Sequence, residues 1–223
     1  EDSSTERNFL MTEESMNIHK ALCELKILDD RIHNAINTNN FVVAVNKTTN
    51  QIDGVSIEQY ANNIKAANQK IQSLIARRSA IKRAVVLSNA TTEITVAGRT
   101  MTVAEAIDER NNGIALRKSY LTALAASYHS ADCELKRNSG ENLQNKCEAY
   151  IQSLFGASDN AVNPDAVASL KQDYMRTHEY MLVDPIGVLN TVSTQQEYCD
   201  NFFAEVDSAL STSNALTVIN IKY

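Results

Sequence analysis

Hydrophobic residues recur at helical spacing over most of the chain. Between residues 57 and 85 they alternate three and four positions apart, through Ile57, Tyr60, Ile64, Ala67, Ile71, Leu74, Ile81 and Val85, with Arg78 at the one position of this pattern that is not apolar. A 3-4 pattern that holds over about four heptads is typical of a coiled coil rather than of a generic amphipathic helix. Stripes of this kind predict helices over 13–37, 56–88, 102–138, 141–155, 164–178 and 185–211.

Capping signals mark the start of two of these helices. Ser56 with Gln59, and Thr102 with Glu105, fit the capping box. In that motif the hydroxyl and the side chain three residues later each accept a hydrogen bond from a backbone amide that the helix leaves unpaired. Both pairs therefore support the predicted helix starts.

Two later helices show a different start. Asn163 followed by Pro164, and Asp184 followed by Pro185, combine a capping residue with a proline suited to the first helical position. The segment Asn-Asn-Gly at 111–113 is unfavourable in a helix, costing about 1 kcal/mol at the glycine relative to alanine. Because the apolar stripe keeps its phase across this segment, we expect a continuous or mildly bent helix.

Short runs rich in β-branched residues predict strands at 41–45, 93–97 and 216–222. The second and third follow the same tripeptide, Ser-Asn-Ala, at 88–90 and 213–215. Since successive helices alternate in direction, both exits should fall at one end of a bundle. We expect Ser-Asn to end each helix and the two strands to pair in one small sheet. A chance match of two short Ser/Asn/Ala-rich stretches is the alternative.

These elements predict a mainly α fold, a long antiparallel coiled-coil helical bundle with a small β-sheet that caps the helix ends. The composition agrees, because 223 residues include two prolines, six glycines and no tryptophan, which favours long helices. Residues 15–223 are expected to form a single elongated helical domain. A polar, mobile leader is expected over residues 1–14.

The charge and cysteine content narrow the choice of partner and compartment. A net charge of −6 argues against nucleic acid or anionic lipid as a partner of the whole surface. No apolar run approaches the roughly 20 residues that span a bilayer. The four cysteines are far apart and form no C-x-x-C pair, which indicates reduced thiols in a cytoplasmic compartment.

The densest basic cluster consists of Arg77, Arg78, Lys82 and Arg83. One interpretation is that it binds phosphates or an acidic partner, because residues 78 and 82 share a helix face. The other is that it follows the helix dipole, which favours positive charge near a helix C-terminus, while the long stems cover apolar surface. The second interpretation is favoured, because no aromatic residues are interleaved with the basic ones.

Three arginines, Arg78, Arg110 and Arg117, stand on the apolar stripes themselves. Buried polar groups at such positions often specify helix register or partner number, at a cost in stability. The alternative is that the stripe turns outward there and the arginines are exposed. The sequence leaves both interpretations open.

Motifs for catalysis or metal binding do not stand out. The chain has no G-x-S-x-G, P-loop or G-x-G-x-x-G sequence, and its four histidines never lie four residues apart. We therefore expect no enzymatic activity, no catalytic residues, no cofactor and no metal site.

Four stretches of the chain carry a family resemblance: MNIHKALCELKILDDRIHNAI, IARRSAIKRAVVLSNATTEITVAGRTMTVAEAI, LVDPIGV and FFAEVDSALSTSNALTVINI. From about Met16 onward the chain resembles a family of uncharacterised phage and prophage proteins often labelled "viral A-type inclusion protein". A more distant similarity, limited to N-x-T followed by G and E-A-I, is to the helical proteins labelled septicolysin-like. The resemblance carries no catalytic residues, and it implies a phage gene product associated with the virion.

The expected function is that of a non-enzymatic phage-encoded structural or assembly protein that acts through helical protein–protein contacts. Its partners would be other phage structural proteins or its own copies, within a virion assembled in the bacterial host cytoplasm. The alternative is a cytoplasmic phage or prophage accessory protein that binds and modulates a host factor.

Overall fold

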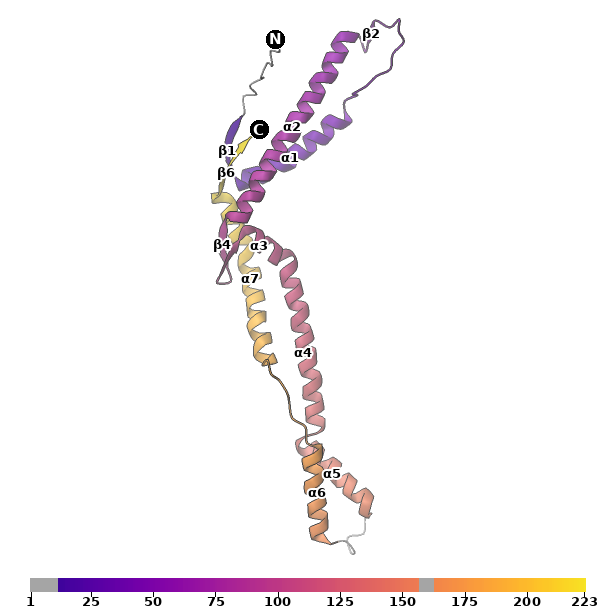
Figure 1. The fold of residues 1–223 in the computed structure, drawn as a ribbon, viewed down its shortest axis with the longest axis vertical. Helices are drawn as coiled ribbons and strands as arrows, with labels where there is room; N and C mark the ends of the chain where they lie inside the picture. Colours follow the sequence, from indigo (N-terminus) through magenta and orange to yellow (C-terminus); the bar gives the residue numbers. More distant parts are fainter. Residues whose placement is uncertain (1–11, 157–162) are drawn as a thin grey trace, which may run out of the picture. The chain divides into compact units, whose positions relative to one another are not determined.

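The computed structural model describes residues 12–156 and 163–223, and it confirms a mainly helical chain with small antiparallel sheets (Figure 1). The helices are α1 (Ile18–Asn37), α2 (Ile57–Thr91), α3 (Val103–Asp108), α4 (Ile114–Arg137), α5 (Gly140–Phe155), α6 (Pro164–His178) and α7 (Val188–Leu216), with a π-helical segment η1 (Glu109–Gly113). The strands are β1 (Glu13–Asn17), β2 (Gln51–Ile52), β3 (Val55–Ser56), β4 (Glu93–Val96), β5 (Arg99–Thr102) and β6 (Val218–Lys222).

The chain divides into two compact units, whereas a single domain was expected over 15–223. Unit one contains residues 1–110 and 202–223, and unit two contains residues 111–201. The division falls within η1, where Asn-Asn-Gly was expected to bend the helix without breaking it. The structure passes from α3 through η1 into α4 with no interruption, in keeping with the use of π-helical turns to absorb an irregularity.

The core of unit one lies between a two-stranded sheet and two helices. Strand β1 pairs antiparallel with β6, and one face of this pair packs on α1 and α2 (Figure 1). The buried cluster draws residues from all four elements: Met16, Ile18, Ala21, Leu25, Leu28, Ile81, Val85, Ile219 and Ile221. Two chain segments about 200 residues apart are therefore joined in one core.

This sheet corrects the prediction for the start of the chain. Residues 13–17 were assigned to the first helix and residues 13–14 to the mobile leader, whereas they form β1. Helix α1 begins at Ile18, because the side chain of Asn17 caps it by accepting a hydrogen bond from the Lys20 amide at 2.8 Å. The rest of the predicted leader, residues 1–11, lies outside the described residues.

The predicted pairing of 93–97 with 216–222 is wrong. Strand β4 pairs with β5, and β6 pairs with β1. The β4–β5 turn consists of Ala97 and Gly98, both at positive φ (50° and 71°), as in the type I′ turns that match the twist of a hairpin. A two-residue turn closes at low entropic cost, so β4 finds its partner locally. Glu205 of α7 accepts the Ala97 amide at 2.7 Å.

The two Ser-Asn-Ala segments do mark similar helix ends, although neither ends its helix at Ser-Asn as predicted. Both helices continue through Ser-Asn-Ala and end at Thr91 and Leu216. In each case the next residue donates its amide to the serine carbonyl four positions earlier, at 2.8 Å for Thr92 and 2.9 Å for Thr217. A strand follows immediately, so the two copies share a local geometry and differ in their strand partners.

The strand predicted at 41–45 is absent, and this stretch is irregular in the structure. Its apolar side chains are exposed, with Val42 at 87%. The nearby hairpin instead pairs β2 with β3, around Asp53 and Gly54 at positive φ. A strand requires a neighbour for its backbone hydrogen bonds, and β-branched residues alone do not supply one.

The capping predictions have different outcomes. Thr102 and Glu105 form the full capping box. Ser56 accepts the Gln59 amide, but the Gln59 side chain bonds to Asn63 instead of returning to the cap.

The proline-based starts also differ. The structure confirms Asn163 as the cap of α6, with Pro164 at its first position. The start predicted at Pro185 is wrong, because α7 begins at Val188 and the Asp184 carboxylate accepts the Val188 amide at 2.9 and 3.1 Å.

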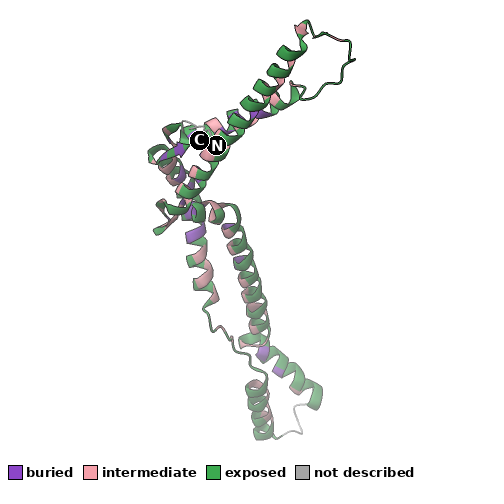
Figure 2. Ribbon diagram, turned by 45° about the horizontal axis from the view of Figure 1, so that its top comes forward, coloured by how far each residue is buried: buried purple, intermediate pink, exposed green. Residues whose placement is uncertain are grey.

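Unit two buries little of its helical surface. Within α4 the buried residues are Ile114 and Leu121, in α5 they are Leu143 and Cys147, and α6 has none. Figure 2 shows the exposed residues covering most of these ribbons. Helices α5 and α6 contact each other, and Tyr150 stacks on Tyr174 with ring centroids 5.0 Å apart.

Candidate functional site

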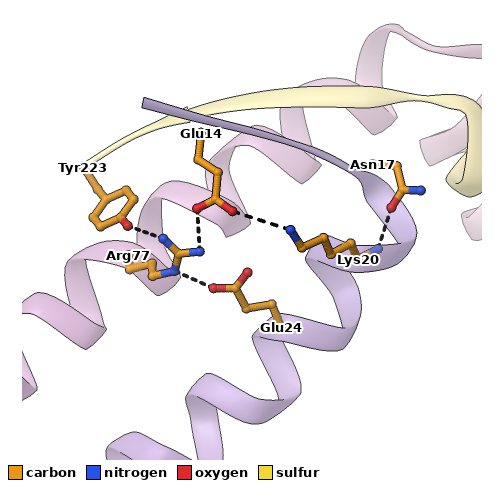
Figure 3. A network of polar contacts seen from close by, with 6 residues as sticks. All are labelled: Glu14, Asn17, Lys20, Glu24, Arg77 and Tyr223. Atoms are coloured by element: carbon orange, nitrogen blue, oxygen red, sulfur yellow. Dashed lines mark hydrogen bonds and ion pairs between the residues drawn. The ribbon is translucent and has the colours of Figure 1, made fainter. Parts of the chain in front are cut away.

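Arg77 stands at the centre of a polar network where α1, α2 and the β1–β6 sheet meet (Figure 3). Its guanidinium donates hydrogen bonds to Glu24 of α1, to the Tyr223 hydroxyl, and to Glu14 of β1 at 2.8 Å. The guanidinium carbon also lies 4.9 Å from the centre of the Tyr223 ring. The Arg77 side chain is 19% exposed, and those of Glu24 and Glu14 are 21% and 32% exposed, so the guanidinium is largely shielded from water while its partners are partly exposed.

The network perturbs its acidic and basic groups in opposite directions. Hydrogen bonding from Arg77 lowers the pKa of the Glu14 carboxyl below its usual value near 4.5, and partial burial opposes this shift. Hydrogen bonds to Glu24 and then Glu14 raise the pKa of Arg77, so it stays charged at every accessible pH. Lys20 adds a second cation at 3.6 Å from Glu14.

Arg78 makes a simpler contact one residue further along α2. It donates to both carboxylate oxygens of Asp29 on α1, and this hydrogen bonding lowers the pKa of Asp29. Both side chains are about two-fifths exposed. The pair therefore connects the two helices at the edge of their contact, in a solvated position.

The other two members of the predicted basic cluster lie elsewhere. Lys82 and Arg83 are exposed on α2, and the positive charge of Lys82 contributes to the lowered pKa of Asp29. Arg83 lines an open groove between α2 and β6. The structure therefore does not bring Arg77, Arg78, Lys82 and Arg83 together into one phosphate-binding site.

Arg110 and Arg117 each contact α7. Arg110 forms an ion pair with Asp207 at 2.8 Å within unit one. Arg117 lies over the Tyr198 ring at 5.2 Å within unit two, at a separation typical of cation–π contacts. Together with Arg78, all three stripe arginines contact a neighbouring helix from partly exposed positions, so both interpretations of these arginines stay open.

The residues that sequence reasoning missed are the partners of Arg77. Glu14, Glu24 and Tyr223 come from three separate elements. Arg77 lies one position before the apolar stripe, so the sequence pattern gave less reason to expect a helix contact there than at Arg78. One signal was available in the sequence. Glu14 and Met16 are two positions apart just before Asn17, so in a strand their side chains lie on the same face.

An open groove with a volume of about 840 Å³ runs between α2 and β6 in unit one. Its α2 wall contains the small residues Ala76, Ser79, Ala80, Ala84 and Ser88, and its other wall is β6 with the flanking residues 217 and 223. Arg83 and Lys222 are the charged residues of the lining. The groove offers small, apolar and basic surface beside a strand.

Comparisons with protein-family models, with curated proteins and with solved structures gave no match for this chain. None of the helices described is both long and apolar enough to cross a membrane.

The lowered pKa of Glu14 predicts a pH-dependent contribution to the stability of unit one. A carboxyl whose pKa is lowered by folding stabilises the fold above its usual pKa, and this contribution is lost as the pH falls through the lower folded-state value. Glu14→Gln is expected to be less stable than the parent at pH 7, with a gap that narrows below about pH 4.5. Urea denaturation of the parent and of Glu14→Gln between pH 7 and pH 3 measures this difference in the free energy of unfolding.

Glu148→Gln on α5 is the matched control, because it makes the same chemical change outside the network. It is expected to follow the parent over the whole range. A Glu14→Gln gap that stays constant from pH 7 to pH 3 would show that the carboxylate charge contributes nothing and that the loss is steric.

Proposed function

We propose that the chain is a non-enzymatic structural or assembly protein that acts through helical protein–protein contacts. The observation that carries this proposal is how little of its helices the chain itself covers. Helix α2 has 35 residues and buries Ile71, Ile81 and Val85, α4 has 24 residues and buries two, and α6 buries none of its 15. Most helical stability in proteins comes from packing an apolar face, so these helices are suited to packing against a partner.

The exposed apolar residues support the same proposal. Leu87 on α2, Leu116 on α4 and Leu189 on α7 are all more than half exposed. Single exposed apolar residues are common on protein surfaces, so these leucines support the proposal only as part of the helix faces that the chain leaves uncovered. The partners would be other structural proteins of a particle or further copies of this chain.

We propose further that the helices form a coiled-coil bundle in this assembly. Helices α1 and α2 run antiparallel, because Glu24 lies beside Arg77, Asp29 beside Arg78, and residues 34–38 beside residues 66–70. In the proposed assembly, helices from a partner complete the remaining 3-4 stripe of α2. Arginines at the helix contacts would then fix the register, as polar residues do in coiled coils.

Association with a phage particle is the proposal that the family resemblance adds. Quantitative mass spectrometry of purified, nuclease-treated particles from the phage or prophage that encodes the chain tests it. We expect a fixed ratio of this chain to the portal or major capsid protein. Abundance in infected cells together with absence from particles would contradict it, and would favour an accessory protein that binds a host factor.

A further inference from the structure

Strand β6 has a free edge whose backbone groups can be identified from the register. Thr12 and Tyr223 exchange both backbone hydrogen bonds, and Ile18 donates to Thr217. Hydrogen-bonded positions alternate along an antiparallel pair, so Ile219 and Ile221 bond to β1. Val218, Asn220 and Lys222 therefore turn their amides and carbonyls to the opposite side. No strand of the described residues pairs with that side.

The groove described above runs along this free edge. Small side chains on α2, including Ala76, Ala80 and Ala84, leave the room beside β6. An unpaired strand edge is a template for another strand, and edge addition is a common mode of peptide recognition in which the backbone supplies affinity and side-chain pockets supply specificity. The geometry thus suits an extended segment of about five residues.

The chain also contains an extended segment that has no strand partner among the described residues. Residues 179–184, Glu-Tyr-Met-Leu-Val-Asp, link α6 to α7 without regular structure. Met181 is 80% exposed and Val183 is 75% exposed. These two side chains are two positions apart, so they share one face of an extended backbone. Tyr180 donates its amide to the Asn138 carbonyl at 3.1 Å, which anchors one end of the segment.

Charge selects this segment over the other exposed apolar stretch, residues 41–45. The charged groove residues, Arg83 and Lys222, are both basic. Lys222 forms an ion pair with Glu13 of β1, so Arg83 is the main cation that the groove offers to an incoming segment. Residues 179–184 begin with Glu179, and the carboxylate of Asp184 at their end is held by the Val188 amide, whereas 41–45 is flanked by asparagines and followed by Lys47. Opposite charges steer and align two surfaces as they meet, so the acidic segment is the better complement.

We propose that residues 179–184 of one copy add as a third strand to the free edge of β6 in a second copy. With Met181 and Val183 opposite Ile221 and Ile219 in an antiparallel register, their side chains turn toward α2, because opposed residues in a sheet share a face. Leu182 then exchanges backbone hydrogen bonds with Asn220, while the Tyr180 amide keeps its bond to Asn138. Since edge and segment are different surfaces, this contact is heterologous, and it builds rings or open chains of subunits. The inference rests on the proposed function and deepens it by naming the partner as a second copy.

Sedimentation velocity of the full chain over a wide concentration range tests the proposal. A single added strand buries less than the ~1,200 Å² of a standard interface, so we expect weak, concentration-dependent self-association that salt weakens further. Asn220→Pro removes one outward amide while leaving the β1 ladder intact, since prolines are tolerated on strand edges. We expect it to raise the dissociation constant at least about tenfold, and Asn220→Ala, which keeps the amide, to leave it close to the parent value.

The segment is tested by Met181→Lys with Val183→Lys, which should reduce self-association as strongly as Asn220→Pro. Val43→Lys with Val45→Lys is the matched control, with the same spacing and charge change, and should associate like the parent. A mixture of the edge variant with the segment variant restores one intact contact per pair. We therefore expect the mixture to form dimers, and nothing larger, at concentrations where each variant alone is monomeric.

Several outcomes would overturn the inference. One is a parent chain that is monomeric at every concentration, and another is equal loss for Asn220→Ala and Asn220→Pro. Loss with the 43/45 variant but not with the 181/183 variant would assign the contact to residues 41–45. If Asn220→Pro does not fold, the two lysine variants still decide between the segments. If the chain is monomeric in solution but is found in particles at a fixed ratio, the self-association is contradicted and the proposed function is not.

Discussion

A chain that ends at Leu216 is expected to lose amide-exchange protection over β1 and much of the stability of unit one, while β4 remains protected. The truncation removes β6, which pairs with every residue of β1, and with it the buried side chains of Ile219 and Ile221. Truncating one buried isoleucine to alanine costs about 2–5 kcal/mol. Losing two of them together with a strand ladder is a large part of the roughly 5–15 kcal/mol that stabilises a typical domain.

Strand β4 should keep its protection because it depends on other contacts. Its ladder partner is β5, and the buried residues Val96, Val103 and Phe202 lie outside the cluster that β6 completes. Hydrogen exchange followed by mass spectrometry resolves the two strands. The milder variant Ile221→Ala gives the same contrast if the truncated chain does not fold. Protection lost at 93–96 but kept at 13–17 would contradict the observed pairing.

Some local signals in the sequence predicted local structure correctly, whereas the start at Asp184-Pro185 was wrong and Ser56 with Gln59 forms only half of a capping box. The Thr102–Glu105 capping box and the Asn163-Pro164 start are both present, and the helix predicted at 141–155 ends at Phe155. Each depends on hydrogen bonds or backbone angles within a few residues. Such features are decided by the residues in the motif, so no knowledge of the tertiary fold was needed.

The strand partners could not be predicted in the same way. Strand β1 was hidden inside a longer helical stripe, because Ile18, Leu25 and Ile32 continue the apolar spacing directly after it. A strand pair is specified by burial of one face, and that face is visible only once α1 and α2 are placed. The sequence therefore located the strands at 93–96 and 218–222 but gave no means of choosing between their partners.

The candidate site shows the same limit. The stripe positions of Arg78, Arg110 and Arg117 left open whether these side chains are buried or exposed, and in the structure each is partly exposed and contacts a neighbouring helix. Arg77 was interpreted as one member of a basic cluster that follows the helix dipole. Its shielding arises from β1 and from Tyr223, which are distant in sequence, so the more buried of the two adjacent arginines was the less evident one.

Arg77→Met is expected to lower the free energy of unfolding by about 2 kcal/mol, the scale of hydrogen bonds made to charged groups in shielded positions. Methionine keeps a long apolar stem and high helix propensity, so the change removes mainly the guanidinium. The carboxylates of Glu14 and Glu24 then lose the cation between them. The shift in the urea midpoint at an unchanged m-value measures the loss.

Arg78→Met provides the matched control, because the adjacent arginine also pairs with a carboxylate of α1 but in a solvated position. Exposed ion pairs contribute little, so its effect should be clearly smaller. Adding Glu24→Gln to Arg77→Met should recover part of the stability, because breaking a shielded pair is costly mainly through the charge left behind. Equal losses for the two arginines, with no recovery, would mean that the network does not hold β1, α1 and α2 together. The apolar cluster of Ile81, Val85 and Ile219 would then join the sheet to the helices without it.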